Sequence, residues 1–145
     1  MTRHFTSIFL LALLLLAIVA PVVAKQHVMI TPEYEAFAPA ITRPLTQQDV
    51  RAAVIDAAQA RGWVVTGDEP GKLTLRYAPR THLAVIAVDY DDKGFKIGYV
   101  TSEDLDYEVK RGKTYIHGNY NLWLERLSHD IKNSKVLWSV VDIAK

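Results

Sequence analysis

Histidine, tyrosine and asparagine side chains fall in two stretches of this chain where they could form one polar site. His82 opens an expected strand, and His117 stands just before an expected helix. A buried neutral imidazole with an amide or hydroxyl partner can act as a general base or hold a polar ligand. Such a site favours small-molecule binding or weak hydrolase-type catalysis. The candidate residues are Arg80, His82, Tyr99, Tyr107, His117, Asn119 and Asn121.

The same residue types also suit an ordinary structural network. An asparagine, either Asn119 or Asn121, can cap the N-terminus of the expected helix. His117 can bond a neighbouring carbonyl, and the tyrosine hydroxyls can end at the rim of the core. The cluster lacks the paired carboxylates or the orienting acid that catalytic sites use. We therefore expect no catalytic residue here, and we keep a ligand-binding cleft around His82 and His117 as the alternative.

Two familiar motifs, for calcium and for nucleotide binding, fail on their residues, and thiol chemistry is excluded as well. Residues 89–94 begin like a calcium loop, but Lys93 occupies a ligand position and Val100 replaces the closing glutamate. Residues 111–114 end like a phosphate-binding loop, but Tyr107 stands where its first glycine should be. The chain has no cysteine, which excludes thiol catalysis and thiolate metal sites. The sequence thus predicts no metal and no cofactor.

The first element that must position these residues is a helix that begins after Thr46. Thr46 and Asp49 form a pair similar to a capping box at its start, and Gly62 ends it. Apolar residues recur between these ends with helical spacing, which is typical of an amphipathic helix with one buried face. They are Val50, Ala53, Val54, Ala57 and Ala58.

Alternating apolar residues predict four strands after this helix, at 63–66, 72–77, 82–90 and 95–99. The third strand is apolar on both sides, which is typical of a central strand. Turns of hairpin length separate the strands and favour antiparallel pairing. In the turn before the fourth strand, Gly94 is available for a positive φ.

A small hairpin and a second helix complete the expected domain. Residues 107–110 and 114–117 can pair across a short turn, and the helix that follows carries an apolar stripe. The stripe consists of Tyr120, Trp123, Leu124, Leu127 and Ile131. The fold class that follows is α+β, with an antiparallel sheet of four or more strands and two helices packed on one face of it.

The N-terminus has the layout of a cleavable signal peptide. Arg3 and His4 provide a basic start, residues 8–20 form an apolar run, and compact residues follow. The run is shorter than the roughly 20 residues that span a bilayer. We therefore expect cleavage after Ala24 and release into the periplasm without a stable membrane anchor. Residues 25–45 contain three prolines and few periodic apolar positions, which predicts an extended arm.

The expected organisation has four parts, and the last of them is ambiguous. The parts are the signal peptide at 1–24, the arm at 25–45, the α+β domain at 46–133 and an apolar segment at 134–145. The apolar segment either covers the core as a short helix or strand, or docks on a partner or a membrane surface.

The charge balance and the apolar positions that are expected to be exposed limit the classes of function. The chain carries 17 Lys and Arg residues against 16 Asp and Glu residues, a balance that argues against a nucleic-acid-binding protein. If both helices cover one face of the sheet, then Leu83, Val85 and Val100 point outward and need a cover. We therefore expect an exported, non-enzymatic protein that binds another envelope component, or a second copy of itself as a homodimer.

Two groups of short motifs point to a known family. The first group is Ala60-Arg61-Gly62-Trp63, Pro70-Gly71 and Arg80-Thr81-His82. The second is Tyr99, Ser102, Leu105 and Tyr107, followed by Ile116-His117-Gly118-Asn119-Tyr120-Asn121-Leu122-Trp123. Together they resemble a family of small bacterial envelope proteins, which are commonly described as lipoproteins or exported proteins without an assigned activity. Members commonly carry a cysteine for lipid attachment, and its absence here implies a soluble periplasmic form. The resemblance implies no ligand and no catalytic residue.

Overall fold

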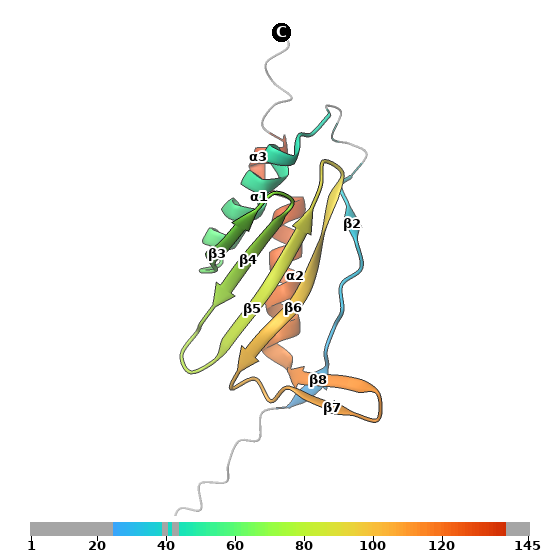
Figure 1. Ribbon diagram of the computed structural model, residues 1–145, viewed down its shortest axis with the longest axis vertical. Coiled ribbons are helices and arrows are strands. Elements are labelled where there is room, and N and C mark those ends of the chain that lie inside the picture. Colours follow the sequence, from blue (N-terminus) through green and yellow to red (C-terminus); the bar gives the residue numbers. More distant parts are fainter. Residues whose placement is uncertain (1–24, 39–40, 42–43, 139–145) are drawn as a thin grey trace, which may run out of the picture.

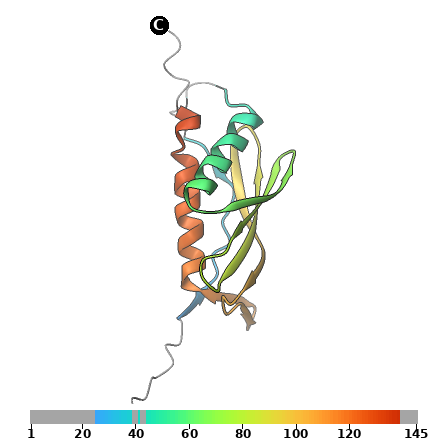
Figure 2. The ribbon, with the colours of Figure 1, turned by 90° about the vertical axis from the view of Figure 1, so that its left-hand side faces the viewer.

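The computed structural model describes residues 25–38, 41 and 44–138. These residues form two antiparallel sheets, of five and three strands, with the helices on one face of the larger sheet (Figures 1 and 2). The predicted α+β class with two helices on one sheet face is therefore confirmed. Within the described ranges, no helix combines the length and the apolar character that a membrane crossing requires.

Helix α1 (Gln47–Ala60) forms where the sequence predicts it. The Asp49 N–H donates to the Thr46 hydroxyl, and the Thr46 N–H donates to the Asp49 carboxylate, so the helix starts with a full capping box. Gly62 follows the last turn with a φ of +78°, a left-handed conformation that favours glycine. All five predicted apolar residues of the helix are buried.

The larger sheet has the strand order β2-β6-β5-β4-β3. Its strands are β2 (Glu35–Ala36), β3 (Val64–Glu69), β4 (Lys72–Tyr77), β5 (Leu83–Tyr90) and β6 (Gly94–Glu103). β5 lies at the centre and pairs antiparallel on both sides, as its two apolar faces predict. The positive φ expected at Gly94 is wrong, because the left-handed glycines in the described ranges are Gly62, Gly71 and Gly112.

The helices pack against only one of the two faces of the larger sheet. Side chains that point toward the helices, such as Leu75 and Ile86, are completely buried. On the open face, Leu83 and Val85 are half-buried. The sheet also carries strongly exposed valines, because Val64 and Val100 are 58% and 51% exposed, respectively. The helices thus bury one face and leave apolar surface in contact with solvent elsewhere on the sheet.

The smaller sheet fixes the start of the second helix. Its strands, in the order β1-β8-β7, are β1 (Gln26–Val28), β8 (Lys113–His117) and β7 (Glu108–Lys110). Helix α2 (Gly118–Lys132) begins at the residue that follows β8. Ile116, one residue before the end of β8, is completely buried, so core packing anchors this junction.

The predicted extended arm at 25–45 is an integral part of the fold, because it supplies one strand to each sheet. β1 pairs with β8, and β2 pairs with β6. The Glu35 carboxylate also accepts hydrogen bonds from the Ser128 hydroxyl at 2.6 Å and the Lys132 ammonium at 2.5 Å, both on α2. Burial raises the pKa of Glu35, but these donors outweigh it and hold the net pKa below its ordinary value.

Replacing Glu35 with glutamine is expected to destabilise the fold at neutral pH and to have little effect in acid. Because the folded-state pKa of Glu35 lies below its ordinary value of 4.5, the ionised carboxylate contributes stability above pH 4.5. This contribution is lost as the pH falls through the lowered pKa. The Glu35 side chain is 27% exposed, so we expect a loss of about 1 kcal/mol at pH 7.

Denaturant unfolding at pH 7 and pH 3 measures this effect. The exposed residue Glu33, two positions earlier, gives the matched control Glu33→Gln, which should change little at either pH. An equal loss for Glu35→Gln at both pH values would show that ionisation of this carboxylate does not stabilise the fold.

The C-terminal segment begins as a short helix, α3 (Lys135–Trp138), which packs on α1. Leu137 is completely buried, and the Ser134 hydroxyl donates to the Asp56 carboxylate of α1 at 3.3 Å. The start of this segment therefore covers the core. The predicted signal peptide at 1–24 and the last residues, 139–145, lie outside the described residues.

Candidate functional site

The structure brings the two predicted histidines together. The ring centroids of His82 and His117 lie 5.3 Å apart, with the rings tilted by 42°, and both side chains are half-buried. His82 immediately precedes β5, and His117 is the last residue of β8. The His117 N–H donates to the Leu105 carbonyl at 2.7 Å, which fixes the end of β8 against the loop that leaves β6.

Hydrogen bonds at Nδ1 assign a different neutral tautomer to each imidazole. The His82 Nδ1 lies 2.6 Å from the Asp104 carbonyl oxygen, and a carbonyl only accepts, so this nitrogen carries the proton. The His117 Nδ1 accepts from the Asn119 N–H at 3.1 Å, so its proton is on Nε2. In the neutral state, His82 therefore offers a ligand an acceptor and His117 offers a donor.

The cap of α2 differs from the prediction. Neither Asn119 nor Asn121 caps the helix, because the N-cap is His117 and its imidazole accepts from the Asn119 backbone. The Asn119 side chain is exposed. The Asn121 side chain instead holds the N-terminal segment, since its Nδ2 donates to the Val28 carbonyl at 2.8 Å and its Oδ1 accepts from the Ile30 N–H at 3.1 Å. Neither asparagine side chain is hydrogen-bonded to the histidine pair within the described ranges.

The two predicted tyrosines lie together, whereas the predicted arginine lies apart. The rings of Tyr99 and Tyr107 stack with centroids 4.8 Å apart and an interplanar angle of 9°. The Tyr99 hydroxyl also lies 3.0 Å from the Ser102 hydroxyl. Arg80 is exposed in the turn before β5 with a φ of +56°. It makes no hydrogen bond, ion pair or ring contact within the described ranges.

The histidine pair continues into a row of aromatic rings that we call the ring ladder, formed by Trp63, Tyr77, Trp123, His82 and His117. His82 lies 6.4 Å from Trp123, and Trp123 meets Tyr77 edge-on at 5.0 Å and 87°. Tyr77 in turn lies 5.1 Å from Trp63. The ladder joins the exit of α1, the end of β4 and the first turns of α2. Trp63 is buried, and the other four rings are half-buried, so the ladder connects the core with the surface.

No family model, curated protein or solved structure matches this chain. The arrangement of the side chains is therefore the basis for assigning a function. Within the described ranges, no group of three or more His, Asp or Glu residues is placed to hold a metal ion. The ring ladder and its surroundings remain the most distinctive polar and aromatic feature on which to base a function.

A cleft of about 270 Å³ opens at the Trp63 end of the ring ladder. We call it the aromatic cleft. Its lining is formed by Ala60, Arg61, Trp63, Tyr77, Trp123 and Arg126. The perpendicular rings of Tyr77 and Trp123 give the cleft a right-angled aromatic corner. A flat ring placed in such a corner can contact one aromatic face and one aromatic edge.

The two arginines of the aromatic cleft differ in how they are held. The Arg61 guanidinium donates two hydrogen bonds to the Asp130 carboxylate, at 2.5 and 3.1 Å. This bidentate contact holds the pKa of Asp130 below its ordinary value. The Arg126 side chain has no hydrogen bond or ion pair with another described residue. The lining of the cleft contains no carboxylate, so the positive charge of Arg126 is not compensated there.

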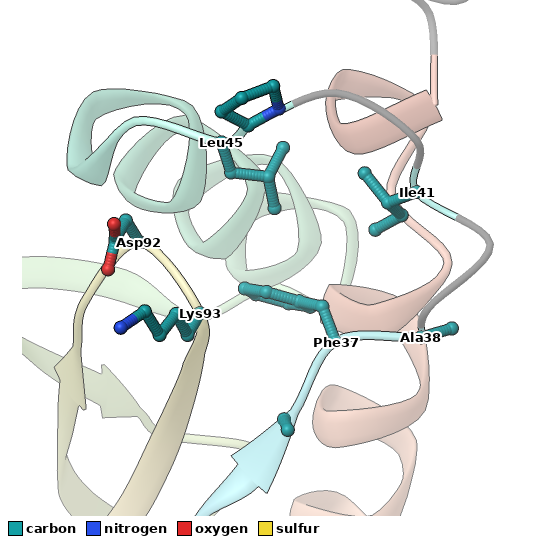
Figure 3. A pocket seen from close by; sticks show the side chains of 8 residues that line it. Phe37, Ala38, Ile41, Leu45, Asp92 and Lys93 are labelled. Carbon is teal, nitrogen blue, oxygen red and sulfur yellow. The ribbon is translucent and has the colours of Figure 1, made fainter.

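A larger hollow, of about 410 Å³, lies beside β2 and the turn between β5 and β6. Figure 3 shows the apolar side chains of Phe37, Ile41 and Leu45 around the same space, with Asp92 and Lys93 at its side. None of the residues predicted for the candidate site lines this hollow or the aromatic cleft. The lining of the hollow carries one aromatic ring, Phe37, whereas that of the aromatic cleft carries three rings and two guanidinium groups.

Three members of the ring ladder were not among the predicted site residues. Trp123 was assigned only to the apolar stripe of α2, Tyr77 only to an alternating strand, and Trp63 only to a strand start. The sequence does indicate which way Tyr77 points, since strand alternation places its side chain on the same face as Leu73 and Leu75. The contacts between these rings depend on how α2 crosses the sheet, which the sequence pattern does not give.

The Tyr120 hydroxyl is buried without a hydrogen-bond partner among the described residues. Removing it with Tyr120→Phe is expected to raise the free energy of unfolding by about 1 kcal/mol, because an unpaired buried hydroxyl costs stability. Denaturant unfolding measures the change. The control Tyr99→Phe removes a hydroxyl that lies 3.0 Å from Ser102, so it should lower stability. A loss of stability in both variants would indicate a hidden partner for Tyr120.

Proposed function

We propose that this chain is an exported, non-enzymatic periplasmic protein that binds a small component of the cell envelope on its ring ladder. The observation that carries the proposal is the continuous row of rings from His117 to Trp63, which ends in the aromatic cleft. Half-buried aromatic rings supply a large contact area and exclude water from polar contacts. The basic start and apolar run of the sequence support export.

The hydrogen bonding of the histidine pair favours binding over catalysis. Each Nδ1 is occupied by a backbone group, and neither imidazole forms an ion pair with a described carboxylate. A catalytic base normally has a third group that orients it and stabilises its protonated form. The remaining Nε2 atoms of His82 and His117 provide one acceptor and one donor, which suits recognition of a polar ligand. Weak hydrolase-type activity is therefore the less favoured use of this pair.

Mass spectrometry of co-purifying compounds tests the proposed function. The full chain, purified from the cell envelope, is heated, and the released compounds of low mass are compared between wild type and Trp123→Leu. This variant keeps an apolar side chain, so the helix can stay packed while the ring is lost. The matched control is Leu122→Ala, because Leu122 is the preceding residue of α2 and is 39% exposed.

We expect a compound that is enriched with wild type and with Leu122→Ala and is depleted with Trp123→Leu. Equal amounts from all three proteins, or no enriched compound from wild type, would contradict the proposed function. Circular dichroism of each variant shows whether the fold is kept. The variant His117→Ala gives a second comparison, because loss of stability with an unchanged set of compounds would limit this residue to its capping role.

A homodimer is the second candidate function, and it is favoured by the exposed valines of the sheet. Val64 and Val100 leave apolar surface in solvent, and sheets can bury such surface by packing face to face. Size-exclusion chromatography with light scattering gives the test. A dimer that becomes a monomer on Val100→Lys would support this candidate, and a wild-type monomer at micromolar concentration would contradict it.

The export part of the proposal has its own measurement. Cell fractionation followed by N-terminal sequencing should find the protein in the periplasm with Lys25 as its first residue. A protein that begins at Met1 and stays in the membrane fraction would contradict cleavage after Ala24.

A further inference from the structure

We propose that the aromatic cleft binds a ring that carries a carboxylate, with the ring against Tyr77 and Trp123 and the carboxylate on Arg126. This inference rests on the proposed function and names the chemical class of the ligand. Its basis is the combination of an aromatic corner, two guanidinium groups and no carboxylate in one lining. Each of these features selects one part of the ligand.

The charge of the cleft selects the anion. Asp130 neutralises Arg61 through two hydrogen bonds, which leaves one uncompensated positive charge on Arg126. A monovalent carboxylate balances this charge and matches the planar fork of a guanidinium. A phosphate dianion requires more positive charge and more donors than one unpaired arginine supplies. The cleft therefore fits a carboxylate better than a phosphate.

The size and shape of the cleft select a single ring. Its volume of about 270 Å³ lies just below the roughly 300–1,000 Å³ of sites for drug-sized ligands. The rings of Tyr77 and Trp123 meet at 87°, so a flat ligand can contact both at once. Either an aromatic ring or a sugar ring can use such contacts. The shared chemistry is thus a ring and a carboxylate, and the source is either an aromatic acid or an acidic sugar.

Titrations with two acids and with their uncharged analogues test the need for the carboxylate and the kind of ring separately. The full chain is titrated with benzoate and with glucuronate, and then with benzamide and glucose, which lack the carboxylate. Tryptophan fluorescence reports binding, because two of the three tryptophans of the chain, Trp63 and Trp123, line the cleft. Ligand-observed nuclear magnetic resonance gives a second reading that does not depend on fluorescence.

We expect at least one acid to saturate the protein below about 10 mM and its uncharged analogue to bind at least about tenfold more weakly. Saturation by benzoate alone identifies an aromatic acid, and saturation by glucuronate alone identifies an acidic sugar. Inorganic phosphate should not compete with either. If neither acid saturates, or if the uncharged analogues bind equally well, the inference is wrong.

The variant Arg126→Gln tests the role assigned to the arginine. It should weaken binding of the acid by about tenfold and leave binding of the uncharged analogue unchanged. The matched control is Arg76→Gln, since Arg76 is also exposed but alternates in β4 with the side chains that face the helices. An equal effect of both variants would overturn the assignment.

The two proposals can fail separately. If the compounds from the cell envelope depend on Trp123 but are uncharged, or bind unchanged to Arg126→Gln, the proposed function holds and the ligand class is wrong. If these compounds do not depend on Trp123, the proposed function itself fails.

Discussion

Replacing Gly94 with alanine is expected to lower the free energy of unfolding by about 2–3 kcal/mol and to loosen β2. A Cβ at this position would lie 2.3 Å from the Glu35 carbonyl oxygen and 2.7 Å from the Tyr34 ring. The nearest atom, the Glu35 carbonyl oxygen, belongs to β2. This strand is paired with β6 here, with Glu35 opposite Phe95 and Ala36 opposite Gly94. The strand must therefore move away, which breaks its pairing and the contacts that follow from it.

The variant Gly98→Ala provides the matched control, because it lies in the same strand. A Cβ there meets only the Ala87 carbonyl oxygen, at 3.9 Å, so the change in stability should stay within about 0.5 kcal/mol. Denaturant unfolding measures both variants, and limited proteolysis of residues 25–38 measures the loosening of the N-terminal segment. Equal stability of the two variants would show that β2 does not hold this close approach in solution.

Replacing Asn121 with alanine is expected to cost about 2 kcal/mol. Its side chain both donates to the Val28 carbonyl and accepts from the Ile30 N–H, so one amide satisfies two backbone groups of the N-terminal segment. The Ile30 N–H is partly buried, and its loss of a partner is the more costly of the two. The result should be lower global stability together with faster hydrogen exchange at Ile30.

The variant Asn119→Ala is the control, because Asn119 lies in the same helical turn and its side chain is exposed. Its replacement should change stability by less than about 0.5 kcal/mol. The variant Asn121→Asp separates the two bonds, because it keeps the acceptor for Ile30 and loses the donor to Val28. If Asn119→Ala and Asn121→Ala had the same effect, the bonds of Asn121 to the N-terminal segment would not stabilise the protein.

Local patterns predicted those parts of the fold in which neighbours along the chain determine the structure. The capping box at Thr46, the helix end at Gly62 and the central position of β5 all follow from spacing within a few residues. The N-terminal strands do not follow from local spacing, because β1 and β2 are only three and two residues long and show no alternation of apolar and polar residues. Their positions depend on partners such as Asn121 and Gly94, which lie far away in the sequence.

The candidate site was predictable in part for the same reason. The chemistry of His82 and His117 could be read from residue type, whereas the stacking of Tyr99 on Tyr107 joins two segments whose contact no local pattern predicts. The cap of α2 was assigned to an asparagine because asparagine is a common capping residue. His117 takes this position since β8 runs directly into the helix, which leaves the last residue of the strand as the N-cap.

The position of β1 and β2 has a consequence for the order of events during folding. These strands precede every other described element in the chain, yet the partner of Val28, Asn121, lies 93 residues later and the partner of Glu35, Lys132, lies 97 residues later. Until β1 and β2 pair, one edge of β8 and one edge of β6 lack a neighbour. Contacts across such long loops form slowly, so we expect β1 and β2 to join their sheets after the β3–β4 and β5–β6 hairpins have paired. The nascent protein is most vulnerable to association through bare strand edges in this interval.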